Sequence, residues 1–339
     1  MMWGMTVSQE IEPAGDVGGH RVLVTGGAGV IARELLELLS ARGAIVLSVD
    51  RMPLDRSAPH GVEHLVADLA TADLGPLIAF SPDIVVHLAA TFERSTESAE
   101  FWPQNWNDNV IVTHRLAEMA AGVGSVRAFV FASSYLIYRT SQYLFSMPQD
   151  EAVALSEDSD IDPRNLCGAA KLYGEAELGF ARDVLGGRFR TVAARIFRVY
   201  GRGSRDVVSR WIRAALRGDP IDVYHPENRF DYVYSRDVAE GLIRMAIDQR
   251  AVGVLNLATG RARPVSDVIT AVESATGRAL DRRTLTVDEP YEASRADVGR
   301  LRERLAWVPD TALEDGIEAL VAHERAALGL GREAVDVGA

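Results

Sequence analysis

Short apolar segments alternate with helical patterns from residue 20 to about residue 197, and this alternation limits the possible folds more than any other feature. The apolar segments are rich in Val, Ile, Leu and Ala, and they predict buried strands. They cover residues 21–25, 44–49, 62–66, 84–88, 128–132 and 191–197. Segments with helical spacing lie between them, at residues 31–39, 105–121 and 165–183. Strands that are apolar on both faces and alternate with helices indicate a parallel sheet covered by helices on both sides.

The regular alternation ends near residue 200. Beyond it, short strand patterns are mixed with helical ones, and a helical tail follows. We therefore expect three parts: a flexible leader at residues 1–19, a first domain at residues 20–200, and mainly a smaller α+β lobe at residues 201–330. Some strands and helices of the lobe are expected to return to the first domain.

Charge and composition exclude several classes of partner. The net charge of -12 and the pI of about 5.1 leave the chain without the positive field that nucleic acid or an anionic membrane requires. Cys167 is the only cysteine, so the chain has no intrachain disulfide, which fits a reducing compartment. No apolar run approaches the roughly 20 residues of a membrane span. His87 and His225 lack metal-ligand spacing. We expect a cytoplasmic protein without metal that binds neither nucleic acid nor membranes.

A glycine-rich turn, TGGAGVIA at residues 25–32, follows the first strand and opens a helix. Glycines there let the backbone approach a pyrophosphate, and the helix N-terminus favours its charge. Asp50 ends the second strand 24 positions after Gly26, where a carboxylate binds the ribose hydroxyls of an adenosine. The same carboxylate repels the 2′-phosphate of NADP and favours NAD, a preference that the flanking Arg33 and Arg51 can soften.

The turn resembles the TGxxGxxG motif of the extended short-chain dehydrogenase/reductase family, with Ala32 in place of the last glycine. Further matches follow in the order of the family: Asp68-Leu69, HLAA at 87–90, Asn109-Val110, Ser133-Ser134 with Tyr138, Pro163, Lys171, Glu175, RIFRVYG at 195–201, DYVYSRD at 231–237, NLA at 256–258, Trp307 and Pro309. The resemblance spans roughly residues 20–325. It implies a Rossmann-type doubly wound parallel sheet with a smaller C-terminal α+β lobe for the substrate.

The resemblance also implies an NAD cofactor and a homodimer built from the helices near residues 105–121 and 165–183. The residues expected at the cofactor are Gly26, Gly29, Val30, Ile31, Asp50, Arg51, Asp68, Leu69, Leu88, Ala89, Ala90, Asn109 and Lys171.

Family members carry a Ser or Thr, a Tyr and a Lys as their active unit, with Tyr and Lys four residues apart on one helix face. The lysine holds the nicotinamide ribose and lowers the pKa of the phenol, which exchanges a proton as hydride moves. Ser134 and Lys171 match, but the residue four before Lys171 is Cys167. The resemblance therefore predicts an atypical Ser-Cys-Lys site.

A thiol is an incomplete substitute for a phenol. Its ordinary pKa of about 8.5 can be lowered by a neighbouring lysine. With bonds of about 1.5 Å, however, it ends several ångströms short of a phenol oxygen, so a water or another phenol has to bridge the gap. Tyr135 is the better candidate, because Tyr173 should point off that helix face. The alternative is that Cys167 is only a small buried apolar residue. Tyr138 is expected in the core.

On the substrate side, nucleotide-sugar enzymes of this family have Asn where this chain has Arg198, and Arg where it has Phe230. Arg198 and Arg229 can form an altered anion clamp, or make surface salt bridges. Glu93 and Arg94 lie in the loop after the fourth strand, near the expected substrate; the alternative is a solvated loop without contact to the substrate.

Tyr135 and Leu136 occupy the positions of the Asp-Glu pair of 4,6-dehydratases in this family. This departure leaves epimerase, ketoreductase or decarboxylase-like chemistry. The leading hypothesis is an NAD-dependent enzyme of the nucleotide-sugar epimerase/reductase type that transfers hydride transiently on a sugar-like substrate. A redox-silent NAD-binding protein and a non-redox isomerase or lyase that uses Cys167 remain the alternatives.

Overall fold

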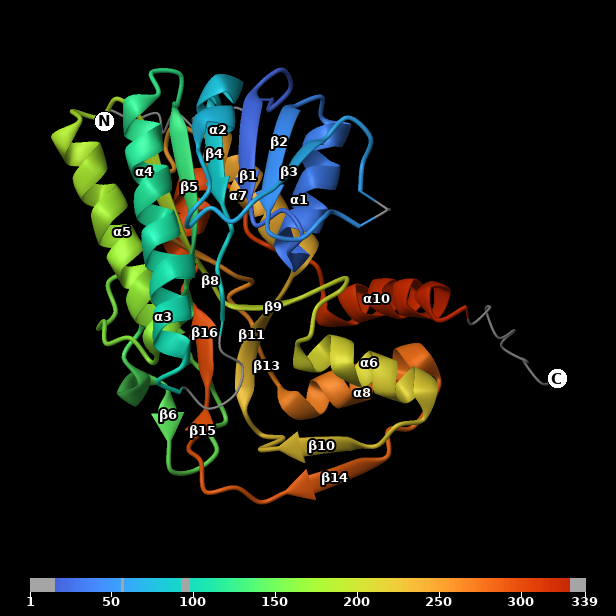
Figure 1. The fold of residues 1–339 in the computed structure, drawn as a ribbon. Coiled ribbons are helices and arrows are strands. Elements are labelled where there is room, and N and C mark those ends of the chain that lie inside the picture. The colour runs from blue at the N-terminus through green and yellow to red at the C-terminus, as the bar shows by residue number, and fades with distance from the viewer. Residues whose placement is uncertain (1–15, 56–57, 93–97, 330–339) are drawn as a thin grey trace, which may run out of the picture.

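The computed structural model describes residues 16–55, 58–92 and 98–329, and it confirms the α/β fold with a parallel sheet at its centre (Figure 1). The sheet has seven strands in the order β12-β8-β5-β4-β1-β2-β3, and every pairing in it is parallel. The strands are β1 (Arg21–Thr25), β2 (Ile45–Asp50), β3 (Glu63–Val66), β4 (Ile84–His87), β5 (Ala128–Ser134), β8 (Arg190–Ile196) and β12 (Gly253–Leu257). The chain first builds the sheet outward from β1 to β3, then continues on the other side of β1 with β4. Ligands of such sheets bind at this switch point, outside the carboxyl ends of the strands.

Helices cover both faces of the sheet, because the side chains of each buried strand alternate between two apolar cores. In β1, Val22 and Val24 contribute to one core and Leu23 contributes to the other. The first core includes apolar residues of α1 (Val30–Ala41) and α7 (Ser235–Ile247), and the second includes residues of α4 (Val112–Gly122) and α5 (Leu166–Val184). Figure 1 shows α4 and α5 side by side along one side of the sheet. A short helix, α2 (Gly75–Phe80), adds Leu77 and Phe80 to the second core.

The expected helix at residues 105–121 is interrupted by a wider turn. It is built from α3 (Phe101–Asn105), the π-helical turn η1 (Trp106–Ile111) and α4. A π turn holds one more residue than an α turn, and such turns often mark functional sites. Hydrophobic periodicity alone does not reveal it, because the flanking α-helical segments keep the same apolar pattern.

A smaller lobe lies below the sheet in Figure 1 and has an apolar core of its own. Its helices are α6 (Val207–Arg217), α8 (Val265–Thr276) and α10 (Leu313–Ala327). Its strands form the pairs β10 (Ile221–Tyr224) with β14 (Arg282–Leu285) and the three-stranded sheet β13 (Ala262–Pro264), β11 (Arg229–Tyr234), β9 (Arg198–Tyr200). Segments beyond residue 200 also return to the first domain: β12 extends the large sheet, and α7 and α9 (Gly299–Leu305) pack on it.

Two short pairings tie the lobe to the segment after β5. They join β6 (Leu144–Phe145) to β15 (Tyr291–Glu292) and β7 (Val153–Leu155) to β16 (Ser294–Ala296). They place the side chains of β15 and β16 next to residues that follow the end of β5.

Residues 16–19, which we expected in the flexible leader, pack onto the first domain. Val17 is 1% exposed and belongs to the core of α1 and α7, and the amide of Gly19 donates to the carbonyl of Gly43 at 3.0 Å. Apolar burial thus reaches further toward the N-terminus than the strand pattern indicated. Residues 1–15 lie outside the described part of the chain.

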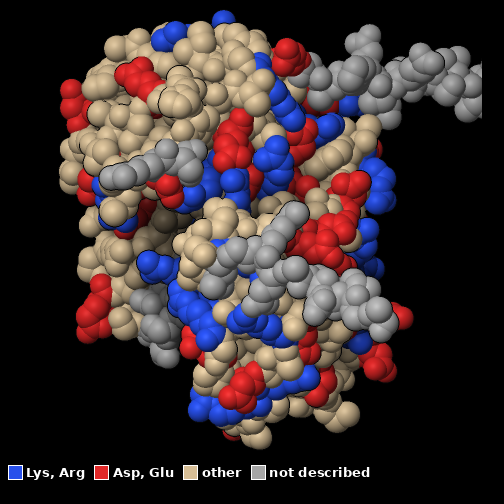
Figure 2. All heavy atoms as spheres, turned by 90° about the vertical axis from the view of Figure 1, so that its right-hand side faces the viewer, with Lys and Arg blue, Asp and Glu red and all other residues tan. Residues whose placement is uncertain are grey.

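Basic and acidic side chains alternate over the face shown in Figure 2, and neither sign covers it. Ion pairs also join separate elements of the chain, as between Glu34 of α1 and both Arg202 and Arg236. No helix within residues 16–55, 58–92 and 98–329 is long and apolar enough to cross a membrane.

Candidate active site

The glycine-rich turn lies directly against the end of β4. Gly26 has a φ of +75°, and a Cβ there would lie 2.6 Å from the amide nitrogen of Ala89. Gly29 is the N-cap of α1 and offers no side-chain acceptor, so the first amides of the helix have no capping side chain. Bare backbone at a helix N-terminus is the surface that a pyrophosphate requires, and the turn therefore fits a dinucleotide.

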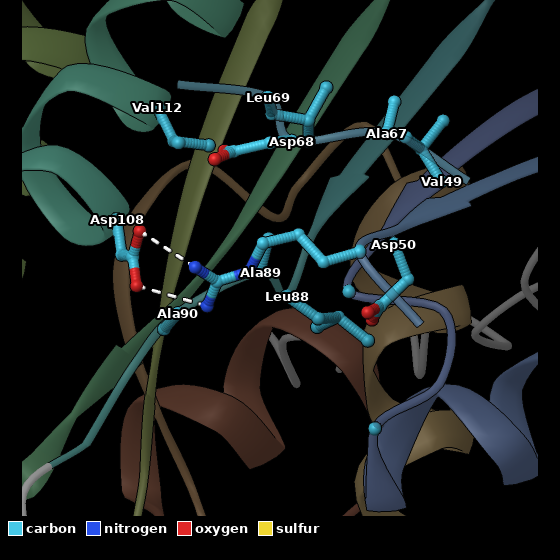
Figure 3. Close-up of a pocket in the computed structure, with 13 residues that line it drawn as sticks. Val49, Asp50, Ala67, Asp68, Leu69, Leu88, Ala89, Ala90, Asp108 and Val112 are labelled. Atoms are coloured by element: carbon cyan, nitrogen blue, oxygen red, sulfur yellow. Dashed lines mark hydrogen bonds and ion pairs between the residues drawn. The ribbon is translucent and has the colours of Figure 1, made fainter. Parts of the chain in front are cut away.

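The turn opens into a pocket at the switch point of the sheet (Figure 3). The carboxylate of Asp50 accepts the amide of Ala28 at 3.0 Å and that of Met52 at 2.9 Å, which fixes it at the end of β2. Nine of the predicted cofactor residues line the pocket: Gly26, Gly29, Asp50, Arg51, Asp68, Leu69, Leu88, Ala89 and Ala90. Val30, Ile31, Asn109 and Lys171 are not part of this lining, and Val49, Ala67, Asp108 and Val112 were not predicted.

Asn109 lies outside the lining of this pocket and hydrogen-bonds the loop that follows β4. Its side chain is 2% exposed; its Oδ1 accepts the amide of Thr91 at 2.8 Å, and its Nδ2 donates to the carbonyl of Thr91 and to Asn105 Oδ1. These bonds fasten the loop that follows β4 to the π turn. Asn109 thus positions the loop that borders the pocket.

His87 ends β4 as a buried, neutral imidazole. Thr113 Oγ1 donates to the carbonyl of Asn109, so it accepts a hydrogen bond from His87 Nε2 at 3.0 Å. The other ring nitrogen, Nδ1, then accepts from Thr25 Oγ1 at 2.7 Å. Burial, and secondly the charge of Lys171, hold the pKa of His87 well below its ordinary value. All hydrogen-bonding capacity of the ring is used, and the described residues contain no cluster of potential metal ligands.

The packing of α5 on the turn after β5 connects two of the predicted catalytic segments. A Cβ on Gly168, in the first turn of α5, would lie 2.6 Å from the carbonyl oxygen of Leu136. Asn165 caps this helix by accepting the amide of Gly168 at 2.8 Å. Ser134 Oγ in turn accepts the amide of Leu136 at 3.2 Å. The end of β5, with Ser134, and the start of α5, with Cys167, are therefore held against each other.

Cys167 and Lys171 are both buried on α5, one helical turn apart, with 5% and 6% exposure. The Lys171 ammonium lies 4.6 Å from the centre of the Phe131 ring. Burial lowers the pKa of Lys171, and a negative charge on Cys167 acts in the opposite direction. Among the described residues, no carboxylate forms an ion pair with this ammonium. A buried cation without a carboxylate partner is costly for a purely structural residue and points to a ligand.

Tyr135 lies in the core rather than in an open site. Its hydroxyl donates to Glu292 Oε1 at 3.3 Å, and its ring stacks on Phe197 at 5.1 Å. Burial raises the pKa of this phenol above its ordinary value. Both features argue against the predicted role of Tyr135 as a bridging proton carrier. Tyr138 is fully buried, as expected, and donates to Asn256 at 2.6 Å.

A second, larger pocket of about 600 Å³ lies on the lobe, between α6, β10 and β11. Arg198 lines it, with its guanidinium 3.6 Å from the centre of the Phe230 ring and Nη2 3.3 Å from Glu292 Oε2. Arg198 Nε and the hydroxyl of Tyr232 are buried and have no hydrogen-bond partner in the described structure. Orphaned polar atoms in a pocket wall indicate a ligand that satisfies them.

The predicted clamp of Arg198 and Arg229 does not form. Arg198 pairs with Tyr232 across the strands, and Phe230 lies on the same face of β11. Arg229 is the neighbour of Phe230, so its side chain leaves the strand on the opposite face, where Nε donates to the carbonyl of Gln149. Glu93 and Arg94 lie outside the described residues.

The cations that accompany Arg198 come instead from α6, which the sequence analysis did not consider as a site. Arg210, Arg213 and Arg217 line the pocket, together with the rings of Trp211 and Tyr224. Positions 210, 213 and 217 share one face of a helix, and this spacing of arginines is the signal that was available in the sequence.

Fold and pockets define a Rossmann-type dinucleotide-binding protein with a smaller lobe that carries a second pocket. The chain belongs to the NAD dependent epimerase/dehydratase family, whose sequence profile matches residues 22–258, and its cofactor is NAD. It is 30% identical over 326 residues to a UDP-glucose 4-epimerase of Mycolicibacterium smegmatis, with 89% of this chain and 97% of the relative covered.

Two solved structures and a further sequence relative are also similar to this chain over most of its length. MoeE5 in complex with UDP-glucose and NAD is 28% identical with a TM-score of 0.77, and the match covers 91% of this chain and 99% of that one. The UDP-glucose 4-epimerase of Thermus thermophilus in complex with NAD gives the same identity, TM-score and coverage. A UDP-glucuronic acid decarboxylase of Arabidopsis thaliana is 26% identical, covering 89% of this chain and 68% of the relative.

Proposed function

We propose that the protein is an NAD-dependent epimerase of a nucleotide sugar, in which Cys167 stands at the position of the family tyrosine. The observation that carries the proposal is the buried, carboxylate-free Lys171 one turn from Cys167, on a helix whose start packs against the end of β5 at Ser134. This is the arrangement that a proton-transfer site beside a nicotinamide needs.

The three side chains have separate roles in this proposal. When bound, NAD accepts a hydride from a sugar carbon and returns it. Ser134 Oγ accepts the Leu136 amide with one lone pair, so its O–H remains able to donate to the sugar oxygen. Cys167 takes the proton of that oxygen, directly or through a water. The Lys171 charge stabilises the thiolate and holds the cofactor ribose.

The pocket on the lobe is proposed to bind the nucleoside diphosphate. Guanidinium groups from Arg198 and α6 match phosphate oxygens, and the rings of Trp211, Phe230 and Tyr232 offer surfaces for a base. A diphosphate oxygen or a base atom would also satisfy the orphaned Arg198 Nε and Tyr232 hydroxyl. The relatives named for UDP-glucose support this choice of substrate class.

We also propose a homodimer across α4 and α5. Large apolar side chains are exposed on this side of the molecule, from the segment α3–η1 and from α5: Trp102, Trp106, Tyr173, Phe180 and Val184. Such a set of exposed apolar residues on adjacent helices is typical of an interface.

The replacement of the phenol by a thiol favours one alternative, a redox-silent NAD-binding protein. Two measurements distinguish an active epimerase from a redox-silent NAD-binding protein. Mass spectrometry of the molecules released on denaturation should find NAD, and UDP-sugars incubated with the protein should equilibrate with their C4 epimers.

Variants of α5 then test the site. We expect Cys167→Ala to lower kcat at least about a hundredfold, because general acid–base catalysis contributes about 10²–10⁴. Tyr173→Phe, on the exposed face of the same helix, is the matched control and should retain full turnover. Unchanged turnover in Cys167→Ala removes the thiol from the mechanism, and the absence of epimerisation of any UDP-sugar by NAD-loaded protein rejects the proposed function.

A further inference from the structure

The side chain of Arg51 extends across the pocket that Asp50 and Asp68 line. Arg51 follows Asp50 at the end of β2, and its guanidinium forms a two-pronged ion pair with Asp108 of the π turn. Nη1 lies 3.2 Å from Asp108 Oδ1, and Nη2 lies 3.0 Å from Oδ2. Figure 3 shows Asp50 and Asp108 on opposite sides of the pocket, with these two bonds dashed at Asp108. The guanidinium is therefore held on the side of the pocket away from the Asp50 carboxylate.

The position of this guanidinium matters for the cofactor. The Asp50 carboxylate, fixed by two amides, marks where the ribose hydroxyls of the adenosine bind. A 2′-phosphate has to lie beside Asp50 and the residue that follows it. Arg51 is the one basic side chain among the described residues that line this pocket, and it is also the residue in that place. Arg33, nearby on α1, is paired with Asp55 at 3.1 Å.

We infer that Asp108 is a specificity-determining residue, which enforces NAD over NADP by holding Arg51 away from the ribose 2′-position. The ion pair acts in two ways. It occupies the one cation that the described lining of the pocket offers to a phosphate. It also leaves the carboxylates Asp50 and Asp68 without a neighbouring positive charge, so that they repel that phosphate. Loss of the Asp108 charge reverses the first effect and weakens the second.

A competition experiment tests this role without any turnover measurement. Protein is equilibrated with equal, saturating concentrations of NAD and NADP, desalted and denatured, and the released dinucleotides are quantified by mass spectrometry. In Asp108→Asn, we expect the ratio of bound NADP to bound NAD to rise at least about tenfold, the effect of one charge-assisted hydrogen bond. The substitution keeps the shape of the side chain, and retained NAD binding verifies that the pocket is folded.

Two further variants separate the released arginine from the change in charge. Asp68→Asn removes one carboxylate of the same pocket but leaves Arg51 paired, and it should change the ratio less than about threefold. Arg51→Ala combined with Asp108→Asn restores the net pocket charge of the wild type and should also restore its ratio.

Three results overturn the inference: an unchanged ratio in Asp108→Asn, an equal gain in Asp68→Asn, or a gain that persists in the double variant. Because only binding is measured, each result is independent of whether the proposed epimerase activity is found.

Discussion

The buried ion pair beneath the candidate active site allows a quantitative prediction. Glu175 of α5 and Arg195 of β8 have side-chain exposures of 5% and 3%, and two bonds of 3.0 and 2.8 Å join them. Ser133 Oγ donates to the same carboxylate at 2.5 Å. In Glu175→Gln, Arg195 keeps its charge in the interior and loses its counter-ion. Removal of one partner of a buried pair typically costs about 3–5 kcal/mol of folding free energy.

The expected fall in Tm follows from this loss of folding free energy and from the length of the chain. At about 2.1 cal/mol/K per residue, 339 residues give an unfolding entropy near 0.7 kcal/mol/K. The loss of about 3–5 kcal/mol then lowers Tm by about 4–7 °C. The matched control is Glu314→Gln, which breaks an ion pair with Arg263 in which the acid is 48% exposed. An exposed pair contributes about 0–1 kcal/mol, so Tm should fall by no more than about 1.5 °C.

Differential scanning calorimetry at pH 7 measures both variants under the same conditions. A fall in Tm for Glu175→Gln that matches that of Glu314→Gln would refute the reasoning, because the buried Arg195 would then tolerate the loss of its counter-ion. A second check is Arg195→Met in the Glu175→Gln background. It removes the unpaired charge and should recover part of the lost Tm.

Three further predictions concern other parts of the molecule. Arg198→Ala should weaken UDP binding about tenfold in isothermal titration while NAD binding is retained; equal weakening of both ligands would contradict the separate-pocket assignment. The hydrogen bond that His114 donates to the Glu177 carboxylate raises the pKa of His114. This contact therefore stabilises the fold below the ordinary pKa of about 6.5, and the stabilisation is lost as pH rises through the raised folded-state value. The Tm difference between wild type and His114→Asn should thus be larger at pH 6 than at pH 8.5, and a difference independent of pH would show that the contact is not linked to protonation. Phe180→Glu, at a 70% exposed position of α5, should convert a dimer to monomers in light scattering, and an unchanged mass would exclude this face as the interface.

The parts of the fold that depend on short stretches of sequence were predictable. The Gly26 turn and Asp50 are defined by backbone conformation and by spacing along two consecutive strands, so both lie where expected. The parallel sheet follows from strands that are apolar on both faces, because that pattern is stable only between two layers of helices.

Features that arise from distant contacts were not predictable. Asp108 and Arg51 are 57 positions apart, and their ion pair depends on a π turn that the hydrophobic pattern does not reveal. The hydroxyl of Tyr135 donates to Glu292, which β15 brings beside it from more than 150 positions further along the chain. Likewise, the alternation of faces in β11 separates Arg229 from Arg198, and this follows from a register that only the folded lobe defines.

The π turn η1 has a consequence for how this helix tolerates insertion and deletion. The turn holds one residue more than an α turn, while α4 on its C-terminal side packs against the sheet and α3 on its N-terminal side contacts α5. Deletion of a single residue within 106–111 can therefore be absorbed locally, by conversion of the turn to regular α-helix. Asp108 and Asn109 would then rotate relative to the pocket, and the bonds to Arg51 and Thr91 would be lost. A change of one residue in the length of this turn would thus alter the contacts around the pocket and leave the apolar core in place.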